Sequence, residues 1–186
     1  MLLQWIRKKE EKEHTLEIRH ATAQDLPAIE ALYAAARAYM KENGNPNQWG
    51  DRYPDEATVA DDLARERLYL CTEKGEILGV FCYFFGSDPT YATITEGSWP
   101  NDRPYGVIHR IATAAHQRGV ASFCFAHCLS LCGNLRIDTH RDNLPMQRAL
   151  AKNGFVYCGI IHLENGDPRL AYQVVSEAES ATTVGV

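Results

Sequence analysis

The sequence contains no long apolar run, no excess of basic residues and no C-x2-C pair of cysteines. Without a run of about 18 apolar residues, no segment is expected to span a membrane. Nineteen Lys and Arg residues against 24 Asp and Glu residues give a net charge of −5. This charge disfavours a nucleic-acid binder, because proteins of that class depend on a basic surface.

The six cysteines all lie in apolar stretches of the sequence. Cys124, Cys128 and Cys132 recur every four residues and therefore share one face of a helix, whereas zinc sites usually begin with a C-x2-C pair. We interpret the cysteines as reduced core residues and expect no metal. Reduced thiols, together with a charged start that is the reverse of a secretory signal, favour a cytoplasmic location.

The length and composition indicate one globular domain. The chain has 186 residues, of which 45% are apolar and 23% are charged, so it can bury a stable core without disulfide bonds or structural metals. We divide it into a charged leader at residues 1–14, one domain at residues 15–176 and a tail at residues 177–186. The leader is a candidate contact for a second copy of the chain, so a homodimer is an open alternative.

Hydrophobic periodicity predicts a mixture of strands and helices. Alternation and turn residues predict strands at residues 15–20, 68–72, 77–85, 90–95, 105–113, 134–139, 155–163 and 169–175. Helical spacing predicts helices after residue 22 and at residues 55–67, 121–132 and 145–153. The helix at 121–132 is apolar nearly all round, so it should be buried on more than one side. Hairpins imply antiparallel pairs and crossovers imply a parallel pair, so we expect one α/β (α+β) domain with a mixed sheet flanked by helices.

The segment from residue 105 to residue 121 combines a strand, a short turn and the start of a helix. The first N–H groups of a helix have no intrahelical acceptor, and the helix dipole adds positive charge there. Gly119 allows an anion to approach the main chain closely, and Arg118 adds a charge-assisted donor. Two interpretations stay open at this point: a phosphate-binding turn and an ordinary turn glycine.

Two motifs, one in this segment and one downstream of it, bear on that choice. The first is His116-Gln117-Arg118-Gly119-Val120-Ala121, and the second is Asn143, a helix and Gly154-Phe155, with Asn143 eleven residues before Gly154. Together they resemble the cofactor site of the GNAT N-acetyltransferase superfamily, whose pyrophosphate loop reads Gln/Arg-x-x-Gly-x-Gly/Ala. Gly119 and Ala121 fit that loop, and His116 departs from it. The resemblance covers roughly residues 16–175 and includes the order of the elements.

The resemblance implies transfer of an acetyl group from acetyl-CoA to a primary amine of a small molecule or peptide, by direct attack. It implies a mostly antiparallel sheet in which two parallel strands, here 105–113 and 134–139, splay apart around the pantetheine arm. Main-chain dipoles would polarise the thioester carbonyl. The residues that the resemblance places at the cofactor are Ile111, Ala112, Thr113, Gln117, Arg118, Gly119, Val120, Ala121, Ser122, Asn143 and Met146.

His109 is the expected general base. An amine with a pKa of about 10.4 is protonated near pH 7 and needs a proton acceptor, and an unperturbed histidine suits that role. By the period of two, His109 shares a strand face with Ile111 and Thr113, and some arylalkylamine-acetylating members of the superfamily carry a histidine at this place. The alternatives are a core histidine satisfied by the backbone, or Glu96 and Asp102 as the groups that receive the amine.

The tyrosine that usually protonates the leaving thiolate in this superfamily is missing from the sequence. Members of the superfamily often use a tyrosine four residues before the Gly-Phe pair, and Leu150 stands at that place. Tyr157, Tyr172 or water are the expected substitutes. Leu150 also favours an alternative function, a non-catalytic coenzyme A-binding sensor or structural domain, whereas His109 favours an enzyme.

For the acceptor we expect a pocket formed by Trp49, Tyr53, Glu96, Trp99 and Tyr105. Aromatic side chains supply apolar walls or cation–π contacts, and a carboxylate balances the charge of an amine. The alternative is that these aromatic residues pack in the core or at its rim.

Overall fold

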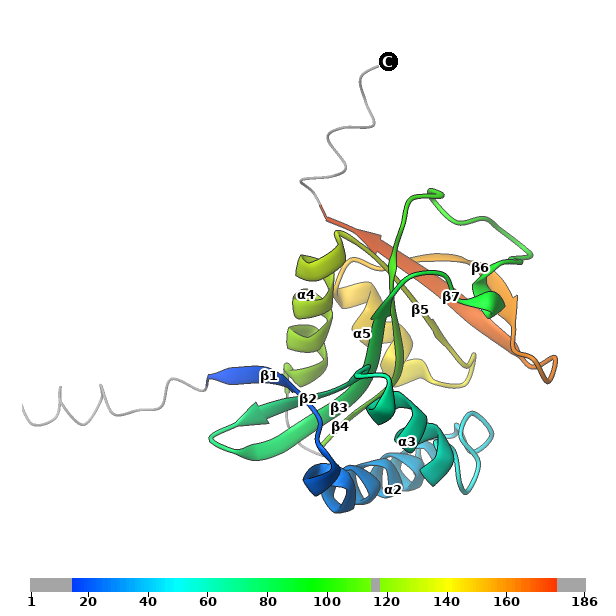
Figure 1. Ribbon diagram of the computed structural model, residues 1–186. Helices are drawn as coiled ribbons and strands as arrows, with labels where there is room; N and C mark the ends of the chain where they lie inside the picture. The colour runs from blue at the N-terminus through cyan, green and yellow to red at the C-terminus, as the bar shows by residue number, and fades with distance from the viewer. Residues whose placement is uncertain (1–14, 115–117, 177–186) are drawn as a thin grey trace, which may run out of the picture.

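The computed structural model describes residues 15–114 and 118–176, so the expected leader at residues 1–14 and tail at residues 177–186 lie outside the described part. It contains a seven-stranded sheet in the order β1-β2-β3-β4-β5-β7-β6 (Figure 1). The strands are β1 (Leu16–His20), β2 (Leu68–Glu73), β3 (Glu76–Phe85), β4 (Gly106–Thr113), β5 (Asn134–Thr139), β6 (Val156–His162) and β7 (Pro168–Val175).

Neighbouring strands pair antiparallel except β4 and β5, which run parallel. The hairpin β2–β3 turns at Lys74 and Gly75, whose φ angles of 50° and 83° suit a tight turn. The hairpin β6–β7 turns around Gly166, with a φ of 85°. The mixed sheet expected from the sequence is therefore confirmed, as are both hairpins.

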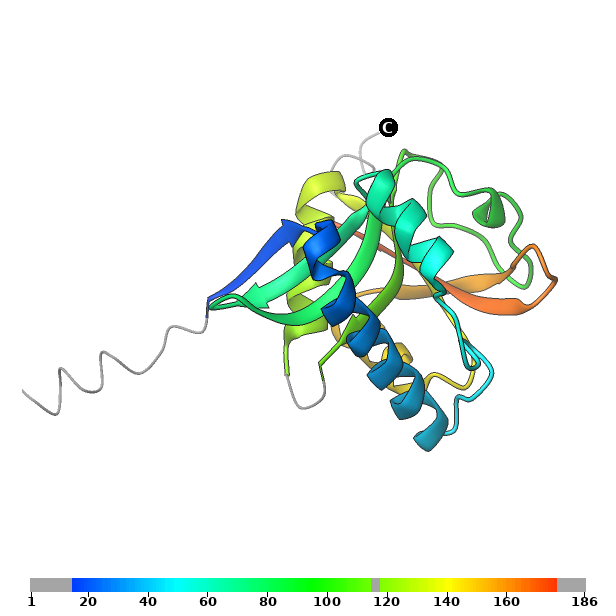
Figure 2. The same cartoon turned by 60° about the horizontal axis from the view of Figure 1, so that its bottom comes forward.

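Four helices in the described part of the chain flank the sheet. Helices α2 (Leu26–Glu42) and α3 (Glu56–Ala64) cover one face, and α4 (Val120–Cys132) and α5 (Leu144–Lys152) cover the opposite face (Figures 1 and 2). Two short 3-10 turns, η1 (Ala23–Asp25) and η2 (Pro89–Tyr91), complete the elements. Within the described residues, no helix combines the length and the apolar character that a membrane span requires.

The helices pack through one face each. Helix α2 buries Ile29, Leu32 and Tyr33, at the spacing expected of a single apolar stripe. Helix α4 buries four residues against the sheet, but Phe123 and Leu131 on its outer side are 37% and 56% exposed. The expectation that α4 is buried on more than one side is therefore wrong, because nothing among the described residues packs over that outer side. The cysteines are free, and all except Cys132 are buried.

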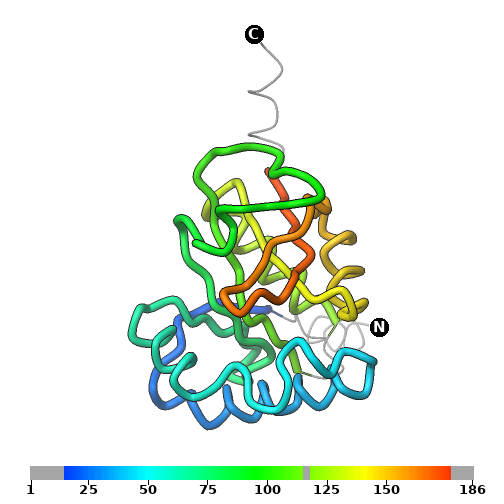
Figure 3. Tube along the Cα trace, turned by 90° about the vertical axis from the view of Figure 1, so that its right-hand side faces the viewer, coloured from blue at the N-terminus to red at the C-terminus, as the bar shows by residue number. Residues whose placement is uncertain are grey.

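Residues 90–95 do not form the predicted strand. Asp88 caps η2 by accepting hydrogen bonds from the Thr90 N–H at 2.8 Å and the Thr90 hydroxyl at 2.6 Å, and Pro89 fixes the first position of the turn. Thr95 forms an isolated bridge with Ile160 of β6. The segment between β3 and β4 is therefore a loop that passes across the β6–β7 hairpin (Figure 3).

A β-bulge interrupts β4 at Arg110. Opposite β3, Cys82 pairs with His109 whereas Val80 pairs with Ala112, so β4 carries one extra residue between these pairs. Arg110 accordingly adopts a positive φ of 53°. Such an extra residue bends a strand and changes which side chains face the core.

The bulge corrects the face that the sequence assigned to His109. Ile108 and Ile111 both lie in the core beneath α4, although they are three residues apart. The His109 ring instead contacts Phe84 and Tyr91 on the other face of the sheet. The predicted face shared by His109 and Ile111 is therefore wrong, because the period of two is broken between them.

The parallel strands β4 and β5 pair only at their beginnings. The pairs run from Gly106 with Leu135 to Ile108 with Ile137, although β4 continues to Thr113 and β5 continues to Thr139. The two strands separate beyond these pairs, just before the bulge. The splayed parallel pair implied by the resemblance is therefore confirmed.

Arg136, on β5, anchors the loop between β3 and β4 to the sheet. Its guanidinium lies 4.1 Å from the ring centroid of Trp99 and 3.9 Å from that of Tyr105. It donates hydrogen bonds to the Asn101 carbonyl at 2.7 Å and to Gln173 Oε1 at 3.0 Å. Arg136 is only 4% exposed, and this burial lowers its pKa. The planar cation thus ties the loop to β5 and β7.

We expect Arg136→Lys to lower the free energy of unfolding by about 2 kcal/mol, because an ammonium cannot reproduce the stacked, forked contacts of the guanidinium. Urea unfolding followed by circular dichroism measures this change. Arg148→Lys, on the exposed side of α5, is the matched control and should stay within about 0.5 kcal/mol of the parent. Equal effects of the two substitutions would contradict the anchoring role.

Candidate active site

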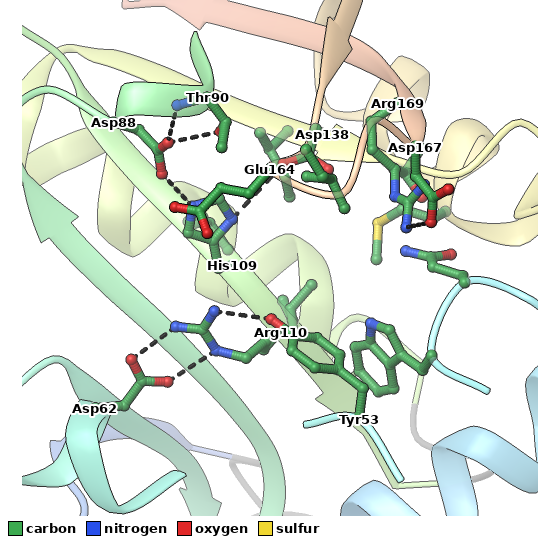
Figure 4. Close-up of a pocket in the computed structure, with 18 of the residues that line it drawn as sticks. Tyr53, Asp62, Asp88, Thr90, His109, Arg110, Asp138, Glu164, Asp167 and Arg169 are labelled. Atoms are coloured by element: carbon green, nitrogen blue, oxygen red, sulfur yellow. Dashed lines mark hydrogen bonds and ion pairs between the residues drawn. The ribbon is translucent and has the colours of Figure 1, made fainter. Parts of the chain in front are cut away.

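A cleft of about 930 Å³ opens where β4 and β5 separate (Figure 4). Its walls come from the loop between α2 and α3, the loop between β3 and β4, the separated ends of β4 and β5, and the β6–β7 hairpin. Of the residues that the sequence singles out, the lining includes Trp49, Tyr53, His109, Ile111, Asn143 and Met146. The cleft thus joins the expected base to part of the expected cofactor and acceptor residues.

His109 lies between two carboxylates in the wall of the cleft (Figure 4). Its Nε2 is 2.7 Å from Oδ2 of Asp88, and its Nδ1 is 3.6 Å from Oδ1 of Asp138. The three side chains are 19%, 11% and 12% exposed, respectively. His109 is therefore held by side chains, not by the backbone as in the alternative of a core histidine.

The ionisation of Asp88 determines which imidazole nitrogen carries a proton. Burial alone would raise the pKa of Asp88, but hydrogen bonds from His109 and Thr90 and the electrostatic attraction of His109 lower it to about 2. An ionised carboxylate only accepts hydrogen bonds, so Nε2 of His109 must donate the proton in this contact. In the neutral imidazole, Nδ1 then keeps a free lone pair on the side of Asp138.

A buried tyrosine holds Asp138 in place. The Tyr91 hydroxyl donates to Oδ1 of Asp138 at 2.7 Å, and burial and the charge of Asp138 raise the pKa of Tyr91 well above its usual value. The tyrosine therefore remains a donor at neutral pH. The 3.6 Å between His109 Nδ1 and Asp138 Oδ1 is too long for a direct hydrogen bond. An amine or ammonium group, which has several N–H donors, fits this pair of acceptors.

A second charged pair fixes the bulge itself. Arg110 donates from Nε to Asp62 Oδ2 at 2.8 Å and from Nη2 to Asp62 Oδ1 at 2.6 Å. Its Nη1 donates to the Tyr53 hydroxyl at 3.1 Å, and its carbonyl accepts from the Tyr33 hydroxyl at 3.1 Å. The residue with the unusual backbone conformation is thus held by both its side chain and its main chain. Asp62 also neutralises the guanidinium beside the cleft.

The loop between α2 and α3 contacts the start of α5. Gln48 Oε1 accepts hydrogen bonds from Asn143 Nδ2 at 2.8 Å and from Asn45 Nδ2 at 2.7 Å. Asn143 Oδ1 in turn caps α5 by accepting from the Met146 N–H at 3.1 Å. Asn143 therefore joins the acceptor side of the cleft to the helix that follows β5.

The start of α4 has the form of an anion site. Gly119 is the N-cap residue with a φ of 89°, and among the described residues nothing beyond its own chain neighbours lies within 4 Å of the position that a Cβ would take. The N–H groups of Val120 and Ala121 in the first turn have no intrahelical acceptor, and the exposed Arg118 precedes them. Ser122 accepts a hydrogen bond from Asn153 Nδ2 at 3.0 Å.

These features fit the parts of acetyl-CoA that the sequence resemblance implies. The open main chain at the positive end of α4 suits a diphosphate, and the cleft reaches between the separated strands, since Ile111 of β4 and Thr139 of β5 both line it. Gln117, also expected at this loop, lies outside the described residues. Across residues 15–114 and 118–176, no group of three or more His, Cys, Asp or Glu side chains is arranged to hold a metal ion.

Of the residues expected to be catalytic or to receive the acceptor, four do not line the cleft, and neither do Ala112 and Thr113 from the expected cofactor set. Glu96 is exposed in the loop after η2. Trp99 and Tyr105 stack on Arg136 and so serve the anchoring of that loop. Tyr157, on β6, is 50% exposed. Trp49 and Tyr53 line the cleft, with Trp49 packed edge-on between Tyr33 and Tyr53.

Sequence reasoning missed both carboxylates that hold His109. Asp88 precedes Pro89 in a stretch of turn-forming residues, where an aspartate usually signals only a cap. Asp138 follows Ile137 in a strand, where alternation marks it only as polar. Their place in the sequence was the available signal, because each aspartate lies at or just after the end of a strand that neighbours β4, the strand of the expected base.

Comparison with solved structures gives the family. An acetyltransferase of the GNAT family from Streptococcus agalactiae is 31% identical in sequence, with a TM-score of 0.80, over 87% of this chain and 96% of that one. Two others share the fold: a GNAT-family acetyltransferase from Listeria monocytogenes, 18% identical with a TM-score of 0.63 over 87% of this chain and 95% of that one, and a protein from Salmonella typhimurium solved with its cofactor acetyl-CoA, 18% identical with a TM-score of 0.56 over the same shares.

No model of a protein family matches the sequence, and no curated protein matches it. The assignment therefore rests on the match to the Streptococcus agalactiae structure, which spans nearly all of both chains, and on the splayed parallel strands. On this basis the chain belongs to the GNAT family of acetyltransferases.

Proposed function

We propose that the protein is an N-acetyltransferase that moves the acetyl group of acetyl-CoA to a primary amine of a small molecule or peptide by direct attack. Acetyl-CoA supplies the acetyl group in activated form, as a thioester. The observation that carries the proposal is the contact between Asp88 and Nε2 of His109 at 2.7 Å. This contact leaves Nδ1 of His109 free to accept a proton.

His109 and Asp138 together suit the receipt of an amine. Asp138 carries a negative charge toward which an incoming ammonium group is drawn, and its Oδ1 can accept one N–H. Nδ1 of His109, 3.6 Å away from that oxygen, takes the proton that must leave before the nitrogen lone pair can attack. Tyr91 holds Asp138 during this transfer through its hydrogen bond of 2.7 Å.

The two substrates approach from opposite faces of the sheet in this proposal. The anion site at the start of α4 lies on the face that α4 covers, whereas His109 points to the opposite face, where Phe84 and Tyr91 contact it. The separation of β4 and β5 connects the two faces, so the amine and the thioester meet between the strands. Trp49 and Tyr53 supply aromatic walls on the acceptor side.

We expect His109→Gln to lower kcat about 10²–10⁴-fold and to remove the acid limb of the pH–rate profile, because glutamine cannot accept the proton. The assay follows release of free thiol from acetyl-CoA with a panel of amines. His162→Gln, at the exposed end of β6, is the control and should leave the rate unchanged. If the parent protein binds coenzyme A but releases no thiol with any amine, a non-catalytic coenzyme A-binding domain is the better account.

We expect Asp88→Asn to lower kcat roughly tenfold or more with little change in KM, because an amide does not fix the tautomer of His109. It should also remove about 2 kcal/mol of stability at pH 7. The pKa of Asp88 is depressed to about 2, so this stability is present above about pH 4 and disappears as the pH falls toward 2. Urea midpoints of parent and variant at pH 7 and pH 2.5 measure it, and a constant difference would contradict the pairing.

We expect Gly119→Glu to weaken coenzyme A binding at least tenfold, because a carboxylate would replace open space at the positive end of α4 and repel a diphosphate. Titration calorimetry measures the dissociation constant. Gly75→Glu is a matched control, since Gly75 also has a positive φ and open space around its Cβ position, so it carries similar backbone strain. Unchanged affinity in Gly119→Glu would show that the diphosphate binds elsewhere.

A further inference from the structure

Thr139 occupies the end of β5, beyond its last pair with β4. It alternates with Asp138, so its side chain lies on the same face as Ile137, in the direction of α4 and α5. Thr139 is 0% exposed and yet lines the cleft. Its position is thus at the inner part of the cleft, on the face opposite to His109.

The hydroxyl of Thr139 has no hydrogen-bond partner among the described residues. Only two buried side-chain polar atoms in that part of the chain share this property, Thr139 Oγ1 and Asn45 Oδ1, and Asn45 does not line the cleft. A buried hydroxyl without a partner is destabilising, and valine would fill the same space at no such cost. The orphaned hydroxyl therefore points to a partner that occupies the cleft.

Two other hydroxyl groups that line the cleft lie on the acceptor side. The Thr90 hydroxyl donates to Asp88, and the Tyr53 hydroxyl oxygen accepts from Arg110. Leu150, at the place where a tyrosine acid is usual, is 0% exposed and carries no proton to donate. Thr139 thus lies on the donor side of the cleft with an unused O–H, on the side from which a leaving group would depart.

We propose that the Thr139 hydroxyl donates a hydrogen bond to the sulfur of coenzyme A as that sulfur leaves the acetyl carbon. The inference rests on the proposed function. In this step the neutral amine nitrogen forms the N–C bond while the C–S bond breaks and the electron pair of the C–S bond moves to sulfur. The proton that the new amide nitrogen loses moves to Nδ1 of His109, which has by then released the earlier ammonium proton to solvent. Thr139 retains its own proton and stabilises the thiolate, because hydrogen bonds to charged acceptors are the stronger ones.

The first test measures binding without turnover. Titration calorimetry compares coenzyme A with desulfo-coenzyme A, which lacks the sulfur, for the parent, Thr139→Val and Thr139→Ser. In the parent and in Thr139→Ser, the preference for coenzyme A should grow as the thiol ionises with rising pH. In Thr139→Val, the increase in this preference with pH should be at least fivefold smaller than in the parent. The affinity for desulfo-coenzyme A should stay the same in all three proteins.

The second test measures the leaving group. With acetyl-CoA, Thr139→Val should lower kcat on the order of tenfold with unchanged KM, and Thr139→Ser should stay within about threefold of the parent. With an acetyl thioester of a more acidic thiol on the same carrier, the kcat values of Thr139→Val and the parent should differ less than with acetyl-CoA. A structural effect of valine would lower the rate equally with both thioesters.

The outcomes separate this inference from the proposed function. If Thr139→Val keeps the pH-dependent preference for coenzyme A over desulfo-coenzyme A, the hydroxyl does not contact the sulfur and the inference is wrong. If the preference is lost but the parent acetylates no amine, the contact stands and the proposed function fails. Tyr53→Phe serves as a further control and should keep the preference, because Tyr53 lies on the acceptor side. Loss of the preference in both variants would show that it does not report a contact specific to Thr139 and would overturn the inference.

Discussion

The extra residue at Arg110 sets the geometry on which the rest of the site depends. It bends β4 at the point where the pairing with β5 stops, and it places His109 and Ile111 on opposite faces of the sheet. A positive φ at a long side chain is unfavourable. The bidentate contact with Asp62 and the bond from Tyr33 to the Arg110 carbonyl supply the fixed partners that hold it.

Most charged side chains at the cleft have a partner that fixes their orientation or neutralises their charge. Asp62 neutralises Arg110, and Asp88 orients His109. Asp138, held by Tyr91, is left facing the free nitrogen of the imidazole. In the proposed function the anionic carrier binds at the helix end at Gly119, where main-chain N–H groups lie on the face of the sheet opposite to His109.

The sequence predicted the elements better than the site, for reasons that particular residues make plain. Alternation and turn glycines located the hairpins, and Asn143 and Gly154 bounded α5, because these signals act over a few residues. The conformation of Arg110 depends on Asp62, 48 residues away along the chain, and no local pattern encodes it. Asp88 and Thr139 look like ordinary cap and strand residues, and only the tertiary structure brings them to the cleft.

The tautomer of His109 is the most direct measure of the account, because it decides whether a lone pair faces the acceptor site. Nuclear magnetic resonance of the protein labelled with 15N-histidine distinguishes the two ring nitrogens near neutral pH. In the neutral form of the ring, the account predicts the proton on Nε2, where Asp88 accepts it, and an unprotonated Nδ1 facing Asp138. A proton resident on Nδ1 in the neutral ring would contradict it.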